Sequence, residues 1–89
     1  MKIKKNYVIQ KIADEYIVVP ISEEADRVHG VIRLNETGAF LWSILENKKV
    51  SKEDLENAVM DKYNVDRHIA HRDIDYFLNK INDIGCLER

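Results

Sequence analysis

Hydrophobic and polar positions alternate along the first part of the chain and then recur every three or four residues along the rest. Residues 7–13 and 15–20 alternate and are rich in β-branched and aromatic side chains, which predicts two strands joined tightly at Asp14 and Glu15. Pro20 has no N–H to donate and should end its strand. After an acidic loop at residues 22–27, residues 31–34 predict a third strand. These patterns predict a three-stranded antiparallel meander.

The second part of the chain predicts helices with clear start signals. Asn35 follows the third strand directly, and its side-chain oxygen can cap a nearly all-apolar helix by accepting from the amide of Thr37 or Gly38. Ser51 and Asp54 form a capping box ahead of a second helix. The positions of this second helix that should face water are Lys52, Glu53, Glu56 and Asp61.

The last predicted helix carries two parallel rows of side chains. It begins after Asp66, extends to about Ile84 and ends at Gly85. Its buried stripe is Ala70, Ile74, Phe77, Ile81 and Ile84. A second row, one step around the helix, is Ile69, Asp73, Tyr76 and Lys80. This mixture of apolar and charged side chains is more typical of the border of a groove than of a core, although Ile69 and Tyr76 could also simply widen the buried face.

Three segments resemble one known family. They are residues 31–42 at the junction of strand and helix, residues 50–55 at the second helix start, and residues 73–78 followed by Ile81 and Gly85-Cys86-Leu87. In these segments the chain resembles the PqqD-like family of peptide-recognition domains, also called RiPP recognition elements. The resemblance covers most of the chain from Ile17 to Leu87. Before the third strand the chain lacks the longer stretch of the founding members, so the resemblance is to the broad family.

The resemblance implies a fold and a function. The expected fold is α+β and winged helix-turn-helix-like, a three-stranded antiparallel sheet followed by three helices, in one domain over residues 1–89. The implied function is non-catalytic: the domain binds the leader segment of a ribosomally synthesised precursor peptide and presents it to a modifying enzyme. In the family that enzyme is often a radical S-adenosylmethionine (SAM) protein, so any cofactor belongs to the partner and none is expected here.

The expected mode of binding is strand addition. One side of the third strand should present unpaired N–H and C=O groups beside the last helix, and an extended peptide can pair with them. Apolar walls are expected from the side chains of the strand and the helix, and attraction for acidic leader residues from their cations. The predicted peptide-binding residues are Val31, Ile32, Arg33, Leu34, Ile69, Arg72, Asp73, Tyr76 and Lys80.

The composition of the chain narrows the kinds of partner and the cellular compartment that it predicts. The 89 residues carry 14 Lys and Arg against 16 Asp and Glu, a net charge of −2 that provides no global attraction for nucleic acid or an anionic membrane. No apolar stretch approaches the roughly 20 residues that a spanning helix needs. The single cysteine, Cys86, favours a cytoplasmic protein. We expect a monomer or weak dimer.

Residues that could carry chemistry are few. His68, His71 and Asp75 share a helix and could bind zinc, but no second group of ligands accompanies them, which favours solvated side chains. Cys86 lies between Gly85 and Leu87, where a small apolar residue would pack. We therefore expect no enzyme activity and no metal.

Two other functions fit the same pattern of elements. A winged-helix DNA-binding regulator would use the last helix for recognition, but the acidic residues at positions 66, 73, 75 and 83 oppose phosphate binding. A structural adaptor could dock an enzyme domain or a second copy of the chain on the same strand edge.

Overall fold

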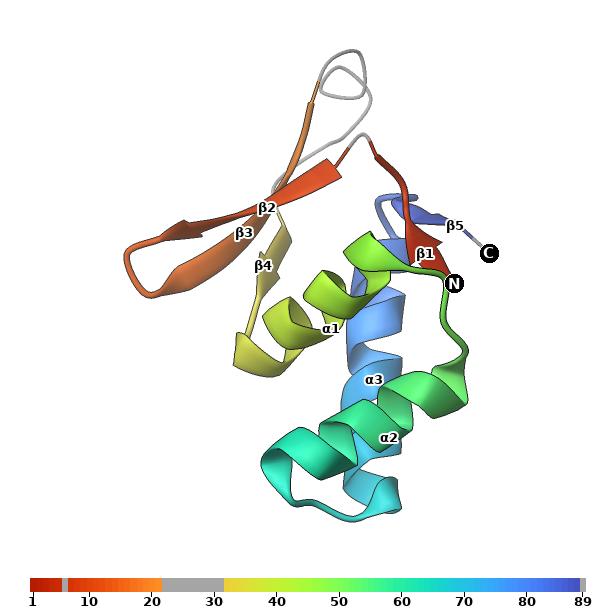
Figure 1. The fold of residues 1–89 in the computed structure, drawn as a ribbon. Helices are drawn as coiled ribbons and strands as arrows, with labels where there is room; N and C mark the ends of the chain where they lie inside the picture. Colours follow the sequence, from red (N-terminus) through yellow and green to blue (C-terminus); the bar gives the residue numbers. More distant parts are fainter. Residues whose placement is uncertain (6, 22–31, 89) are drawn as a thin grey trace.

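The structure, a computed structural model, describes residues 1–5, 7–21 and 32–88. A three-stranded antiparallel sheet has the order β2 (Tyr7–Ile12), β3 (Glu15–Pro20) and β4 (Ile32–Leu34). Three helices follow: α1 (Glu36–Asn47), α2 (Lys52–Tyr63) and α3 (Arg67–Asn82). This order confirms the predicted α+β architecture (Figure 1). The predicted acidic loop and Val31 lie outside the described residues.

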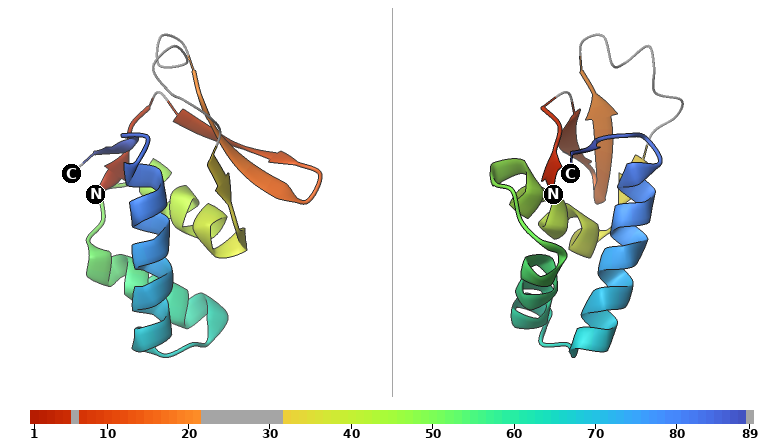
Figure 2. Two further views of the ribbon diagram at one scale, coloured as in Figure 1. Left: turned by 180° about the vertical axis from the view of Figure 1, so that it is seen from behind. Right: turned by 90° about the vertical axis from the view of Figure 1, so that its right-hand side faces the viewer.

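Strands β2 and β3 form a long hairpin that projects away from the helices as a wing (Figures 1 and 2). The register pairs Tyr7 with Pro20 and Ile12 with Glu15, so the turn consists of Ala13 and Asp14. The sequence had suggested a turn one residue later. Ala13 has a φ of 55°, a left-handed conformation that places the two strands in this register. Pro20 ends β3, as expected.

Each predicted helix start is confirmed by its hydrogen bonds. The amide of Gly38 donates to Asn35 Oδ1 at 2.8 Å. The Asp54 amide donates to Ser51 Oγ at 3.1 Å while the Ser51 amide donates to Asp54 Oδ2 at 3.0 Å, which completes the capping box. Asp66 caps α3 through the amide of Ile69. These local bonds position the helices without long loops.

Replacing Asn35 by Ala should lower the free energy of unfolding by about 1 kcal/mol, because the first turn of α1 loses the acceptor for the Gly38 amide. For a domain of this size the melting temperature should fall by roughly 4–8 °C. Thermal denaturation followed by circular dichroism measures the change. The Asn35→Asp variant keeps an acceptor and should stay close to the parent protein, so an equal loss in both variants would contradict the capping role.

The core lies where the three helices meet the inner face of the sheet. Trp42, Leu41 and Leu45 of α1 are fully buried. The predicted stripe of α3 is buried from Ala70 to Ile81, whereas Ile84 lies beyond the helix end and is half-buried. Two further side chains close the end of α3: Tyr7 donates to the carbonyl of Ile84 at 3.1 Å, and Cys86 is fully buried with its thiol donating to the carbonyl of Ile81 at 3.3 Å. As predicted, Cys86 packs as a small apolar residue.

A second, two-stranded sheet joins the two ends of the described chain. Strand β1 (Lys2–Ile3) pairs with β5 (Leu87–Glu88) in antiparallel register. The connection between α1 and α2 is bound to the same region, since the Val50 amide donates to the carbonyl of Met1 at 2.9 Å. The sequence pattern did not predict these strands. No helix in the described part of the chain has the length and apolar character to cross a bilayer.

Candidate functional site

Strand β4 is the edge of the three-stranded sheet. It pairs with β3 through Tyr16 with Leu34, Ile17 with Arg33 and Val18 with Ile32. On its other side, no strand among the described residues pairs with it. The N-terminal segment could have filled this position, but β1 pairs with β5 instead. The outward backbone groups of β4 thus have no strand partner in the described part of the chain, and a sheet edge of this kind can accept a further strand.

The side chains of β4 alternate between the two faces of the sheet. Leu34 is only 6% exposed and belongs to the core, and Ile32 on the same face is half-buried against it. Arg33 points to the opposite face. There it is exposed, with its Nε 3.7 Å from a carboxylate oxygen of Glu15 on β3. The predicted apolar residues of β4 thus face α3 and the core, whereas the Arg33 guanidinium lies on the far side of the sheet.

Helix α3 lies directly beside β4 (Figure 2). His71 and Asp75 occupy one flank of α3 and bond to side chains of α2. The second row predicted from the sequence occupies the opposite flank, about half a turn around the helix. In this row Ile69, Asp73 and Lys80 are half-buried, and Tyr76 is 61% exposed. The row is therefore a partly apolar, partly charged surface that faces away from α2.

Two contacts organise this flank. The Nζ of Lys80 lies 5.5 Å from the centroid of the Tyr76 ring, within the range of a cation–π contact. The guanidinium of Arg72 lies 3.6 Å from a carboxylate oxygen of Asp73. Lys80 thus keeps its positive charge on this flank with no carboxylate partner among the described residues, whereas the charge of Arg72 is partly compensated.

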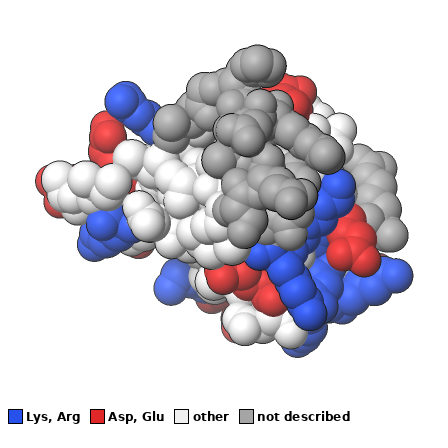
Figure 3. Space-filling model, turned by 90° about the horizontal axis from the view of Figure 1, so that it is seen from above, with Lys and Arg blue, Asp and Glu red and all other residues white. Residues whose placement is uncertain are grey.

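The cations of α3 are mostly engaged within the domain, which argues against a DNA-recognition helix. Arg67 donates to Glu56 Oε1 at 2.7 Å and to Asn57 Oδ1 at 2.9 Å. In Figure 3, the described part of the upper face has several basic side chains close together at the lower right, with acidic side chains beside them. A DNA-binding surface needs several free cations directed at phosphates.

The structure corrects the prediction for Glu56, whose side chain was expected to face water. Its side chain is buried between α2 and α3, where Oε1 accepts from Arg67 and Oε2 lies 2.8 Å from His71 Nδ1. The other ring nitrogen of His71 lies 3.1 Å from Asp75 Oδ2, and Asp75 also pairs with Lys52. We call these five side chains the α2–α3 polar cluster. A carboxylate that pairs with a guanidinium and bonds an imidazole nitrogen can be buried without an unpaired charge.

The polar cluster lowers the pKa of its carboxylates. The hydrogen bond from His71 and then that from Arg67 hold the pKa of Glu56 below its ordinary value. The hydrogen bond from Lys52 does the same for the pKa of Asp75. The two ring nitrogens of His71 face one carboxylate each, Nδ1 that of Glu56 and Nε2 that of Asp75. Among the described residues, no group of three or more His, Cys, Asp or Glu side chains is arranged to hold a metal.

Acid should weaken the packing of α2 on α3. Because the folded pKa of Glu56 lies below the unfolded value of 4.5, this group adds stability above that pH, and the contribution disappears as the pH falls through the lower, folded value. Urea unfolding between about pH 6 and about pH 3 should therefore show a falling midpoint. The Glu56→Gln variant should be less stable near neutral pH and lose part of this dependence. An unchanged pH profile in the variant would contradict the role of Glu56.

Together these observations define the class of the domain: a small α+β domain of the winged helix-turn-helix type, in which β4 is the edge strand among the described strands and lies beside the last helix. The chain belongs to the PqqD family, because the family model described as Coenzyme PQQ synthesis protein D (PqqD) matches residues 15–87.

A solved structure shares the whole fold. The structure of TbiB1 in complex with the TbiA(beta) leader peptide matches this chain with a TM-score of 0.74 and 30% sequence identity. The match covers 99% of this chain and 95% of that chain, so it includes the sheet and all three helices. No curated protein matches the sequence. Neither match points to DNA binding.

Proposed function

We propose that this domain binds the leader segment of a ribosomally synthesised precursor peptide and presents it to a modifying enzyme, without catalysing a reaction itself. The single observation that carries the proposal is the edge of β4 beside α3, with which no strand in residues 1–5, 7–21 or 32–88 pairs. Membership of the PqqD family and the similarity to a protein solved with a leader peptide support the choice of a peptide as the ligand.

The proposed mode of binding is addition of a fourth strand. The leader peptide extends along β4 and exchanges main-chain hydrogen bonds with residues 31–34. Such bonds do not distinguish peptide sequences, so selectivity must come from side chains. Alternate leader side chains would point toward α3, where Ile32, Ile69 and Tyr76 provide apolar contacts and Lys80 attracts a carboxylate.

The burial of the other proposed residues refines their roles. Leu34 is nearly inaccessible and supports the strand from the core side. The side chain of Arg33 lies on the opposite face, so its contribution would be its backbone, together with long-range attraction of acidic leader residues. Arg72 and Asp73 lie close enough to form a mixed pair at the outer border. Val31 would extend the pairing at the start of the strand.

The expected affinity is moderate. A strand with its side chains would bury about 1,000 Å² in total, at the small end of specific interfaces. After the cost of ordering the peptide, the dissociation constant should lie between about 10 nM and about 1 μM. Reversible binding of this strength suits a domain that must release its peptide after modification.

The test uses the leader segment of a precursor encoded near the gene of this chain. Titration into the ¹⁵N-labelled domain should shift amide resonances of β4 and of the Ile69 to Lys80 flank of α3, while those of β2 stay unchanged. The leader with its residue order scrambled serves as the control. Absence of shifts in β4 at about 1 mM peptide would overturn the proposal.

The remaining features of the proposed role concern its partners and setting. The modifying enzyme would be a radical SAM protein, whose cofactors the enzyme itself would hold. The domain would act in the cytoplasm as a single unit over residues 1–89 and as a monomer or weak dimer. It would require neither nucleic acid nor a membrane.

A further inference from the structure

The outer face of the three-stranded sheet, which points away from the helices, is rich in aliphatic side chains. Val18 and Leu34 are buried on the helix side, so Ile17 and Arg33, which pair with each other, point outward. By the same alternation, the outward positions of the hairpin are Val8, Gln10, Ile12, Glu15, Ile17 and Val19. Four of these six side chains are aliphatic and β-branched, whereas the solvated face of an antiparallel sheet is normally polar.

These four side chains, Val8, Ile12, Ile17 and Val19, form what we call the outer aliphatic face. Ile12 is 54% exposed, and Ile21, which directly follows β3, is 43% exposed. The other three members lie between these two residues and are half-buried. The helices lie below the sheet in Figure 1, so the view from above in Figure 3 looks onto this face. In its described part, side chains that are neither basic nor acidic extend from the wing on the left toward the middle, with charged side chains at the margin (Figure 3).

The charged groups that point to this face balance each other. Among the outward positions of β2, β3 and β4 there are one cation, Arg33, and one carboxylate, Glu15. The Nε of Arg33 lies 3.7 Å from a carboxylate oxygen of Glu15. A face without net charge does not attract nucleic acid, an anionic membrane or a strongly charged protein segment. It is complementary to another neutral aliphatic surface.

A second copy of the chain presents a surface of this kind. In a dimer with a twofold axis both copies use the same patch, so a flat aliphatic face packs on an identical one. With the axis beside Arg33, its guanidinium can also approach the partner's Glu15, and the reverse contact forms at the same time. The two opposite charges are therefore complementary to themselves as well as to each other.

The size of the surface fits a weak association. Strands lie about 4.8 Å apart and rise about 3.4 Å per residue, so β2, β3 and β4 together cover roughly 250 Å² in projection. Two such faces packed on each other would bury about 1,000 Å² or less in total, which is less than most stable dimers bury. The expected dissociation constant is therefore about 0.1–1 mM.

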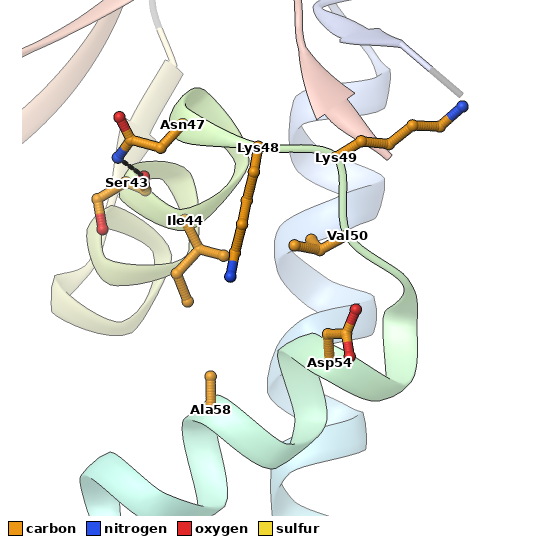
Figure 4. A pocket seen from close by; sticks show the side chains of 8 residues that line it. All are labelled: Ser43, Ile44, Asn47, Lys48, Lys49, Val50, Asp54 and Ala58. Atoms are coloured by element: carbon orange, nitrogen blue, oxygen red, sulfur yellow. Dashed lines mark hydrogen bonds between the residues drawn. The ribbon is translucent and has the colours of Figure 1, made fainter.

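The cavity between α1 and α2 gives no comparable indication of a partner. It has a volume of about 570 Å³, and its lining includes Lys48 and Asp54, whose opposite charges offset each other (Figure 4). Ser43 donates to the carbonyl of Phe40 at 2.6 Å, and the Asn47 amide donates to the carbonyl of Ser43 at 2.7 Å. Neither the charges nor the hydrogen bonds of this described lining define one class of ligand.

We propose that the outer aliphatic face is a self-association surface, on which two copies of the chain pack sheet on sheet in a weak twofold dimer. The outward edge of β4 lies in the plane of the sheet and not on this face, so both copies keep that edge and the exposed flank of α3 accessible. The dimer does not depend on the ligand of the β4 edge. If the proposed function is correct, such a dimer holds two leader peptides.

Sedimentation equilibrium of the full chain between about 10 μM and about 1 mM tests the proposal. The average mass should rise with concentration from that of one chain toward that of two. Over the same range, amide resonances of Val8, Ile17 and Val19 in the ¹⁵N-labelled protein should shift, while those of α2 stay unchanged. Ile12→Lys should weaken the dimer about tenfold or more, because it places a cation in an aliphatic contact.

Tyr76→Lys is the matched control, since Tyr76 is also a large, exposed apolar side chain, 61% exposed, but lies on α3. It should dimerise like the parent protein, and Ile12→Lys should keep its circular dichroism spectrum and its affinity for the leader. A monomer mass up to about 1 mM, equal dimerisation of Ile12→Lys and the parent, or shifts confined to β4 and α3 would overturn this inference alone. Dimerisation as described without leader binding would instead support the outer face and overturn the proposed function.

Discussion

Replacing Trp42 by Ala should remove a large part of the stability of the fold. Trp42 is fully buried at the centre of α1, and its removal opens the largest cavity that one substitution can create in this core. Truncation of a buried Trp costs about 3–5 kcal/mol, against a total stability of roughly 5–15 kcal/mol for a small domain. Thermal denaturation followed by circular dichroism should show a melting temperature lowered by more than about 12 °C or no cooperative transition.

Trp42→Phe is the informative comparison. Among the described residues no acceptor bonds the indole Nε1–H, so Phe removes a buried donor without breaking a hydrogen bond. The variant still fills much of the space and should lose only about 1–2 kcal/mol. A loss in Trp42→Phe as large as in Trp42→Ala would show that the indole N–H makes an essential bond.

A proline in β4 should abolish leader binding in a domain that remains folded. In an antiparallel pair, neighbouring residues direct their N–H groups alternately toward the partner strand and away from it. Of Ile32 and Arg33, one therefore donates to β3 and the other points outward. Proline at the outward position removes a hydrogen bond that only the guest strand uses, and affinity for the leader should fall by more than about tenfold.

Each of the two proline variants serves as the experimental control for the other. Proline at the inward position breaks the ladder between β3 and β4, so this variant should lose stability as well as binding. Isothermal titration with the leader and thermal denaturation are measured for both. Full affinity in the stable variant would exclude pairing along β4 and favour binding by side chains alone.

Much of the fold could be predicted because its signals are local. Asn35, Ser51 and Asp66 each cap a helix with a side chain a few residues from its partner, so a short stretch of sequence contains the whole interaction. The buried stripe of α3 follows from its spacing in the same way. Strands β1 and β5 have only two residues each, which is too short for a periodic pattern, and their pairing depends on where the helices bring the two ends of the chain.

The candidate site, too, could be predicted from the sequence only where its signals are local. The pattern on α3 predicted a partly exposed second row, and the structure places Ile69, Asp73, Tyr76 and Lys80 on one flank. The position of that flank relative to β4 depends on how α3 packs against the sheet. The spacing of residues along the sequence carries no information about this packing. Glu56 was assigned to water for the same reason: its partners Arg67 and His71 belong to another helix. The cavity between α1 and α2 gave no signal, because it arises from the angle between two helices.

The thiol of Cys86 can report when the C-terminal segment of this protein detaches from α3. It is the one cysteine in the chain, it is fully buried, and burial raises its pKa to about 11. Alkylating reagents attack thiolates, so labelling of the native domain should be slow and should proceed through molecules in which the C-terminal segment has detached from α3. Labelling rates measured with and without leader peptide would then reveal whether occupancy of the distant strand edge tightens the whole domain, with no added probe or engineered residue.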